Sequence, residues 1–123
     1  MKIVLESEEA ILLEPTDGPL TIEASSAEMA YSPFHMLASS LATCTFSVLY
    51  SWAIHADLSI NDLTVRVSWT FVDAPHRVGN LQMVLNWPSL PQARAPAATR
   101  AAALCAIHAT LSLPPQIDIR LGS

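Results

Sequence analysis

Two cysteines and a histidine are the residues of this sequence whose types and spacing could do chemistry. Cys44 and Cys105 are its only cysteines, and His108 follows Cys105 by three residues, so on a helix these two would share a face. Outside oxidising compartments, a pair of cysteines indicates buried packing thiols, a metal site or redox chemistry rather than a structural disulfide.

A redox role requires a thiolate, because the neutral thiol is a poor nucleophile. Both cysteines are expected deep inside apolar helices, where loss of hydration raises the pKa of a thiol. A helix dipole acts only within the first turn, so it is not expected to help either cysteine. A reactive Cys44 would therefore need a cation, and Arg66 is the first candidate even though it falls on the polar face of a predicted strand.

A metal site is the weaker alternative. Cys105 and His108 could supply two zinc ligands, with Cys44 and His35 as the others. However, Cys44 and His35 are nine residues apart, which puts them about half a turn out of phase on a helix. We therefore expect no metal. The sequence also has no G-x-S-x-G nucleophile motif, and its three isolated glycines form no phosphate-binding loop.

Cys44 lies in a long segment without charge. Residues 29–56 contain no Asp, Glu, Lys or Arg, which is typical of a membrane span or of a helix in a protein core. Six serines and threonines interrupt the segment after Ser32, and no Lys or Arg flanks it to orient a membrane span. The segment therefore predicts a core helix that begins near Ser32-Pro33 and runs to Ala56.

The rest of the chain predicts strands and a second helix. Alternating or short apolar runs predict strands at residues 2–6, 10–14, 20–25, 63–71 and 81–87, with a hairpin turn at 73–80. An alanine-rich helix is expected at 97–111, followed after Pro114-Pro115 by a last strand at 116–121. The order β-β-β-α-β-β-α-β predicts one α+β domain over residues 1–123, with an antiparallel sheet laid over two apolar helices.

Composition constrains partners and location. The chain is 51% hydrophobic and 14% charged, which is much apolar surface for one small domain, so we expect a homodimer. A net charge of −5 argues against nucleic-acid binding. Three glutamates within the first nine residues are unlike a signal peptide, so a cytoplasmic location is expected.

Two stretches resemble the OsmC/Ohr family. The sequence SPFHMLASSLATC, in which Pro33 precedes Cys44 by eleven residues, resembles the family's helix with the reactive cysteine. RAAALCAIHATL (100–111) resembles its second cysteine helix, with Ala106 in the position of a proline. TDGPLTI resembles the family's early hairpin, and the order of elements agrees over nearly the whole chain.

This resemblance implies an intertwined homodimer that reduces organic hydroperoxides. Cys44 would attack the peroxide, Cys105 would resolve the product to a disulfide, and an external dithiol would reduce it, with no metal or organic cofactor. The chain departs from the family at its activating residues, because Phe34 occupies the glutamate position and residues 11–14 hold no arginine. His35 is a candidate substitute for the arginine, as a protonated imidazole near Cys44.

A second hypothesis is a dimeric binding protein for an apolar small molecule. Its pocket would be lined by Phe34, His35, Met36 and His108, and its cysteines would only pack. Phe34 and Met36 favour this hypothesis, because they make the expected entrance apolar.

Overall fold

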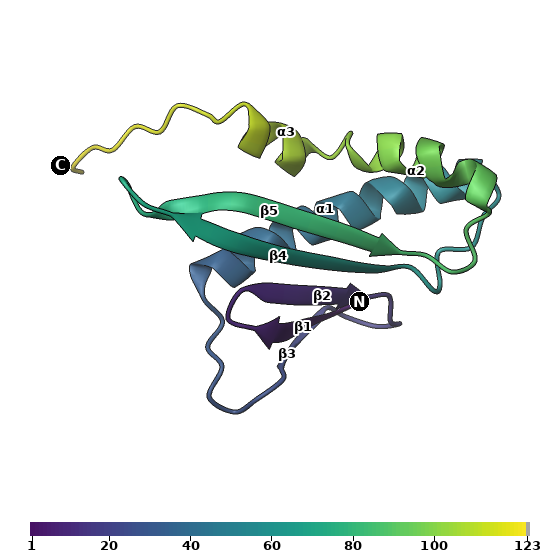
Figure 1. Ribbon diagram of the computed structural model, residues 1–123, viewed down its shortest axis with the longest axis horizontal. Coiled ribbons are helices and arrows are strands. Elements are labelled where there is room, and N and C mark those ends of the chain that lie inside the picture. Colours follow the sequence, from purple (N-terminus) through teal and green to yellow (C-terminus); the bar gives the residue numbers. More distant parts are fainter. Residues whose placement is uncertain (123) are drawn as a thin grey trace.

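The computed structural model describes residues 1–122 as one five-stranded sheet with helices on one face (Figure 1). The strands are β1 (Lys2–Ser7), β2 (Ala10–Glu14), β3 (Thr21–Ala24), β4 (Thr64–Val72) and β5 (Arg77–Asn86). The helices are α1 (Pro33–His55), the short 3₁₀ helix η1 (Gln92–Arg94), α2 (Ala95–Ala102) and α3 (Ala106–Ser112). The predicted α+β class is confirmed.

The strands lie in the order β3-β1-β2-β4-β5. Three neighbouring pairs are antiparallel, whereas β3 runs parallel to β1, with Ile22 opposite Ile3. The prediction of a wholly antiparallel sheet is therefore wrong at this edge. The reason is the connection: after β2 the chain turns near Gly18, passes the beginning of β1 and pairs on the far side of β1.

Helix α1 begins and ends where its sequence provides caps. Ser32 is the N-cap and Pro33 the first helical residue, as predicted. At the other end Asp57 adopts φ 57°, and the Leu58 amide donates to the Ala53 carbonyl at 2.9 Å. This is a Schellman arrangement, which satisfies the last carbonyls of the helix and reverses the chain toward β4.

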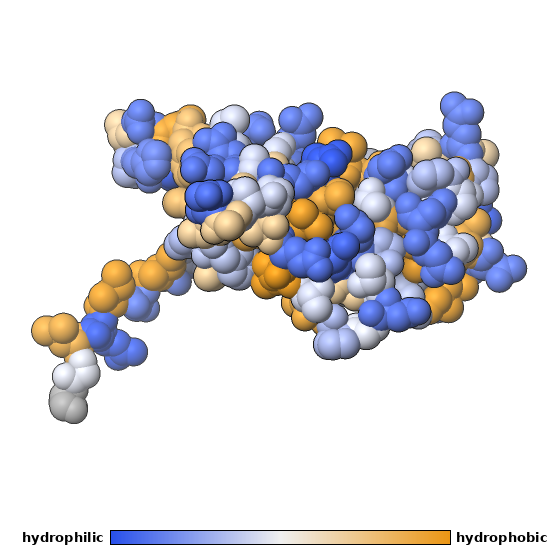
Figure 2. Space-filling model, turned by 90° about the horizontal axis from the view of Figure 1, so that it is seen from below, coloured by the Kyte–Doolittle hydropathy of each residue, from blue (hydrophilic) through white to orange (hydrophobic). Residues whose placement is uncertain are grey.

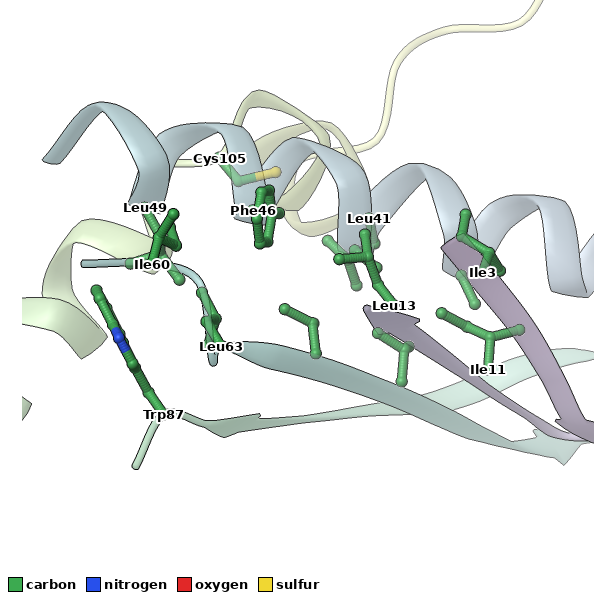
Figure 3. Close-up of a cluster of buried hydrophobic side chains, with 14 of the residues drawn as sticks. Ile3, Ile11, Leu13, Leu41, Phe46, Leu49, Ile60, Leu63, Trp87 and Cys105 are labelled. Atoms are coloured by element: carbon green, nitrogen blue, oxygen red, sulfur yellow. The ribbon is translucent and has the colours of Figure 1, made fainter. Parts of the chain in front are cut away.

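The core lies between α1 and the sheet. Alternate residues of β1, β2 and β4 point toward α1 and are fully buried, and Figure 3 shows several of them beneath Leu41, Phe46 and Leu49 of the helix. Helix α1 is long and apolar enough to cross a membrane by length and composition, but it lies along the sheet with one face buried, as a core helix does. The outer face of the sheet is polar and holds the Glu6–Arg66 ion pair.

The second predicted helix is interrupted. One helix was predicted over 97–111, but α2 ends at Ala102 and α3 begins only at Ala106. Between them Leu104 is exposed, and Cys105 adopts an extended conformation (φ −60°, ψ 131°). Helix propensity alone favours continuation through this alanine-rich stretch, so packing decides the break. The break turns the Cys105 side chain into the core, where it is fully buried. The hairpin turn is also shorter than predicted, because β5 already begins at Arg77.

The predicted last strand is not formed within this chain. Residues 113–122, here called the arm, have no regular secondary structure. Their apolar side chains are exposed, and Figure 2 shows the arm projecting from the body with apolar groups along it. A strand needs a partner for its backbone groups, and the arm has none in the described chain.

Candidate functional site

The two cysteines meet where α3 begins. Cys105 is the N-cap of α3, and its Sγ accepts a hydrogen bond from the His108 amide at 3.4 Å. It belongs to the same buried cluster as Leu41 and Phe46 of α1 (Figure 3). Cys44 is on α1, three residues after Leu41 and therefore next to it on the helix surface, and it is partly exposed. Both thiols are free in this structure.

The surroundings of Cys44 favour its thiolate. Burial raises the pKa of Cys44, but the Cys105 side chain and the backbone N–H groups of Ile107 and Ala106 lower it by more, through hydrogen bonds to the sulfur. The net pKa of Cys44 is below that of an ordinary thiol. Hydrogen bonding to the charged form is one of the recognised ways to lower a pKa. The start of α3 thus favours the Cys44 thiolate, which is the effect that we expected from a nearby cation.

The expectation that no helix terminus would help was wrong. It assumed that Cys105 lay well inside a helix, whereas the chain break makes it an N-cap. The first amides of a helix have no partner within the helix and are available to an acceptor such as Cys44. The sequence carried one signal of this: Ala106 stands where the family pattern has proline, and only alanine has an amide hydrogen to donate.

A cavity of about 440 Å³ opens between the sheet and the helices. It lies between the inner face of β5, one residue of α1, and helices α2 and α3. Its lining is mostly apolar and consists of Leu41, Leu81, Met83, Leu85, Thr99, Ala102, Ala103, His108, Leu111 and Ser112. Neither cysteine lines the cavity, but Leu41 is one helical turn from Cys44, and His108 is one turn from Cys105.

Of the four predicted pocket residues, only His108 lines this cavity. The other three lie at the N-terminal end of α1. Phe34 packs edge-on against Phe71 with ring centroids 4.8 Å apart, and Met36 is 49% exposed.

His35 holds the beginning of α1 in place. Its Nδ1 accepts from the Ser32 amide at 3.2 Å, and the Ser32 hydroxyl accepts from the His35 amide at 3.1 Å, which completes a capping box. Its Nε2 lies 2.8 Å from the Ser7 carbonyl, so Nε2 carries the proton. With both ring nitrogens engaged and only 2% exposure, the imidazole ties α1 to β1. These contacts do not favour His35 as the cation that activates Cys44.

Arg66 does not act on Cys44 either. It lies on the outer face of β4 and forms two hydrogen bonds to Glu6, at 2.7 and 3.0 Å. The sheet separates this face from α1. Among the described residues, no three His, Cys, Asp or Glu side chains are grouped so that they could hold a metal ion.

Among known proteins, no curated one matches this chain. A crystal structure described as an osmotic stress induced and detoxification response protein from Psychrobacter arcticus 273-4 is similar, with a TM-score of 0.61 and 23% sequence identity. The alignment covers 68% of this chain and 62% of that one, so this chain spans less than two thirds of the neighbour's length. At this identity the likeness supports the fold.

The family comparison covers both cysteines. Residues 25–120 match the family described as OsmC-like protein, a range that includes α1, the β4–β5 hairpin, α2 and α3. The matched range is most of the chain and contains the whole candidate site. Together with the order of the elements, this match establishes that the chain belongs to the OsmC-like protein family.

Proposed function

We propose that this protein is a thiol-dependent peroxidase, in which Cys44 attacks an organic hydroperoxide and Cys105 resolves the oxidised product. Membership of the OsmC-like family supports a stress-related redox function in general. The similar protein of Psychrobacter arcticus is described by its detoxification response, which agrees with this class of activity. The assignment of the two cysteines to these roles is our inference.

The proposed reaction needs only the two thiols and a reductant. The Cys44 thiolate attacks the terminal oxygen of the hydroperoxide and the O–O bond breaks, so that Cys44 becomes a sulfenic acid and the alkoxide takes a proton from solvent and leaves as the alcohol. The Cys105 thiolate then attacks that sulfur to form a disulfide, and the displaced hydroxide takes a proton from solvent and leaves as water. An external dithiol reduces the disulfide by exchange and is itself oxidised. A reducing, cytoplasmic location would supply such a dithiol.

The observation that carries this proposal is the position of Cys44 against the start of α3. The Cys105 thiol and two backbone amides act on the Cys44 sulfur at once. This arrangement supplies thiolate stabilisation in a chain that lacks the family's arginine, since residues 11–14 are Ile-Leu-Leu-Glu. It also brings the second sulfur to the first, as the resolving step requires.

The cavity suits an apolar substrate. Leucine and methionine side chains provide most of its wall, and Thr99, His108 and Ser112 add polar groups. A molecule bound there would have its apolar part against β5 and its reactive end toward the cysteines. A pocket of a few hundred cubic ångströms is the usual size for a small-molecule ligand.

We also propose that the protein works as a homodimer. The side of α1 that faces away from the sheet carries Tyr50 and Ile54, which are 50% and 61% exposed, and no charged residue. An uncharged helix face of this kind normally packs against another surface. A second copy of the chain would cover it.

Thiol titration tests the proposed activity. The reduced protein should lose both free thiols on addition of one equivalent of cumene hydroperoxide, and peptide mapping should find a Cys44–Cys105 disulfide. Cys44→Ser should abolish turnover with dithiothreitol. Retention of both thiols under excess hydroperoxide would refute the proposal.

The cavity also favours a second candidate, a binding protein for an apolar small molecule. In that case the cysteines only pack, and the double variant Cys44→Ser/Cys105→Ser should bind apolar ligands as the parent does. A thermal shift that survives both substitutions, in a protein with no peroxide-dependent thiol loss, would select this function. If the protein is a peroxidase, the parent should lose its thiols on addition of hydroperoxide, whether or not the double variant binds apolar ligands.

A further inference from the structure

We propose that His108 relays a solvent proton to the alkoxide that leaves when Cys44 attacks the hydroperoxide. The inference rests on the peroxidase function proposed above and assigns a third residue to its first step. The attack breaks the O–O bond and releases an alkoxide, which is a strong base and a poor leaving group until it gains a proton. A positioned acid typically accelerates such a step by about 100- to 10,000-fold.

His108 belongs to the helical turn that holds both sulfurs. The two amides before it donate to the Cys44 sulfur, and its own amide donates to Sγ of Cys105 at 3.4 Å. The side chain of the same residue lines the cavity, together with Leu41 of α1. A hydroperoxide oxygen in position for attack by Cys44 therefore lies next to the turn of α3 that carries this imidazole.

The ring of His108 is free to take part in a reaction. The chain has four histidines, and three of the rings are engaged: His35 and His55 with backbone carbonyls, and His76 with the carboxylate of Asp73. Within residues 1–122 the imidazole of His108 has no hydrogen-bond partner, although its amide does. The residue is exposed, so the ring can exchange its proton with water.

The other groups around the cavity are poor proton donors. No Asp, Glu, Lys or Arg contributes to its lining within the described chain. The hydroxyls of Thr99 and Ser112 are no more acidic than the alcohol that must form, and the Thr99 hydroxyl already donates to a carbonyl of its own helix at 2.9 Å. Cys105 is fully buried and does not line the cavity. An imidazolium, in contrast, gives up its proton readily near neutral pH.

The proposed step balances without a further reactant. A bond forms between the Cys44 sulfur and the terminal oxygen, which keeps its hydrogen, while the O–O bond breaks and its electron pair stays on the alkoxide oxygen. That oxygen takes the proton of the His108 imidazolium. The products are a sulfenic acid, an alcohol and a neutral imidazole, which regains a proton from solvent.

Two oxidants that differ in their leaving groups test this role. Cumene hydroperoxide releases an alkoxide, whereas peroxybenzoic acid releases benzoate, a stable anion that needs no proton. Each carries one phenyl ring, so both suit the same apolar wall. His108→Gln should lower the second-order rate constant of thiol loss about 100-fold with cumene hydroperoxide and leave it nearly unchanged with peroxybenzoic acid. The rate constants are measured by rapid mixing with the reduced protein.

Two further variants and one alkylation separate proton transfer from structural effects. His76→Gln makes the same change at the tip of the β4–β5 hairpin, outside the cavity lining, and should react as the parent does. Iodoacetamide should alkylate Cys44 of folded His108→Gln at the parental rate, because iodide leaves without a proton. In His108→Ala, imidazole added to the buffer should restore part of the rate with cumene hydroperoxide, since it can enter the space that the side chain leaves.

The outcomes distinguish this inference from the peroxidase function itself. An equal loss of rate with the two oxidants would assign His108 to substrate binding or to the thiolate and would overturn the proton relay. An unchanged rate with cumene hydroperoxide in His108→Gln would overturn it as well. Both results leave the peroxidase standing, whereas a parent that reacts with neither oxidant would refute the peroxidase and the relay together.

Discussion

The Cys105 side chain caps α3 and also acts on Cys44 of α1. One side chain thus completes a helix and lowers the pKa of the neighbouring thiol, and it is the resolving partner in the reaction that we propose. Because Cys105 is fully buried while Cys44 is partly exposed, the two cysteines are not equivalent. This asymmetry favours Cys44 for the attacking role that we propose and Cys105 for the resolving role.

The reactivity of Cys44 should depend on the amide of Ala106. The pKa of Cys44 lies below its ordinary value, so its thiolate persists to lower pH and alkylation by iodoacetamide should have a midpoint below that of a free thiol. Ala106→Pro removes one N–H donor and should shift that midpoint upward. The midpoint is measured from the pH dependence of the alkylation rate.

This substitution is compatible with the backbone. Ala106 is the first residue of α3, where proline is favoured, and Cys105 already has the extended conformation required before a proline. Ala106→Ser retains the amide and is the control. An unchanged midpoint in Ala106→Pro would mean that this amide does not stabilise the thiolate.

Substitutions of Cys105 should separate its two roles. Cys105→Ser and Cys105→Ala should both prevent the disulfide and leave Cys44 as a sulfenic acid that dimedone can trap. Serine is a good N-cap and alanine a poor one, so only Cys105→Ala should also lose the cap. This loss should lower the free energy of unfolding, measured in urea, by about 1 kcal/mol. Equal stability of the two variants would show that the cap contributes little.

His35 should matter for stability and not for the thiol. His35→Ala leaves the Ser32 amide and the Ser7 carbonyl without their buried partner, and should lower the free energy of unfolding by about 1–3 kcal/mol. His55→Ala is the control, since His55 is exposed at the other end of α1. A changed pH midpoint of Cys44 alkylation in folded His35→Ala would contradict the structural role assigned to His35.

The Glu6–Arg66 pair should contribute little and only above acidic pH. Its hydrogen bonds lower the pKa of Glu6, so the contribution is present at neutral pH and disappears as pH falls through the folded-state value, below the ordinary 4.5. Arg66→Ala should therefore cost at most about 1 kcal/mol at pH 7, because the pair is solvent-exposed, and the difference from the parent should vanish in acid. Alkylation of Cys44 should be unaffected; a slower reaction would restore Arg66 as its activating cation.

Filling the cavity should slow reaction with bulky hydroperoxides. Met83→Trp projects a larger side chain into the cavity and should reduce kcat/KM for cumene hydroperoxide about tenfold. This corresponds to an increase of about 1.4 kcal/mol in the activation free energy. Val84→Trp is the matched control, because Val84 is the next residue of β5 and points to the outer face. Equal rates in the two variants would place the substrate elsewhere.

Much of the architecture was predictable from local patterns. Ser32-Pro33 and the charge-free segment after them predicted α1 to within a residue, and the alternation in residues 63–71 predicted β4. These patterns are reliable because caps and alternating burial depend on near neighbours in the sequence. The parallel pairing of β3 was not predictable in this way, because strand order depends on contacts between distant segments.

For the site, the sequence by itself determined the chemistry available: two thiols, an apolar helix around one of them, and an alanine where the related pattern has proline. Only the tertiary structure decided how these are used. The break before α3 depends on burial of Cys105 against α1, and it turns an apparently internal helix residue into an N-cap. The Cys44 thiolate is stabilised by amides more than sixty residues away, and backbone groups leave no signature in a sequence until the fold brings them to the sulfur.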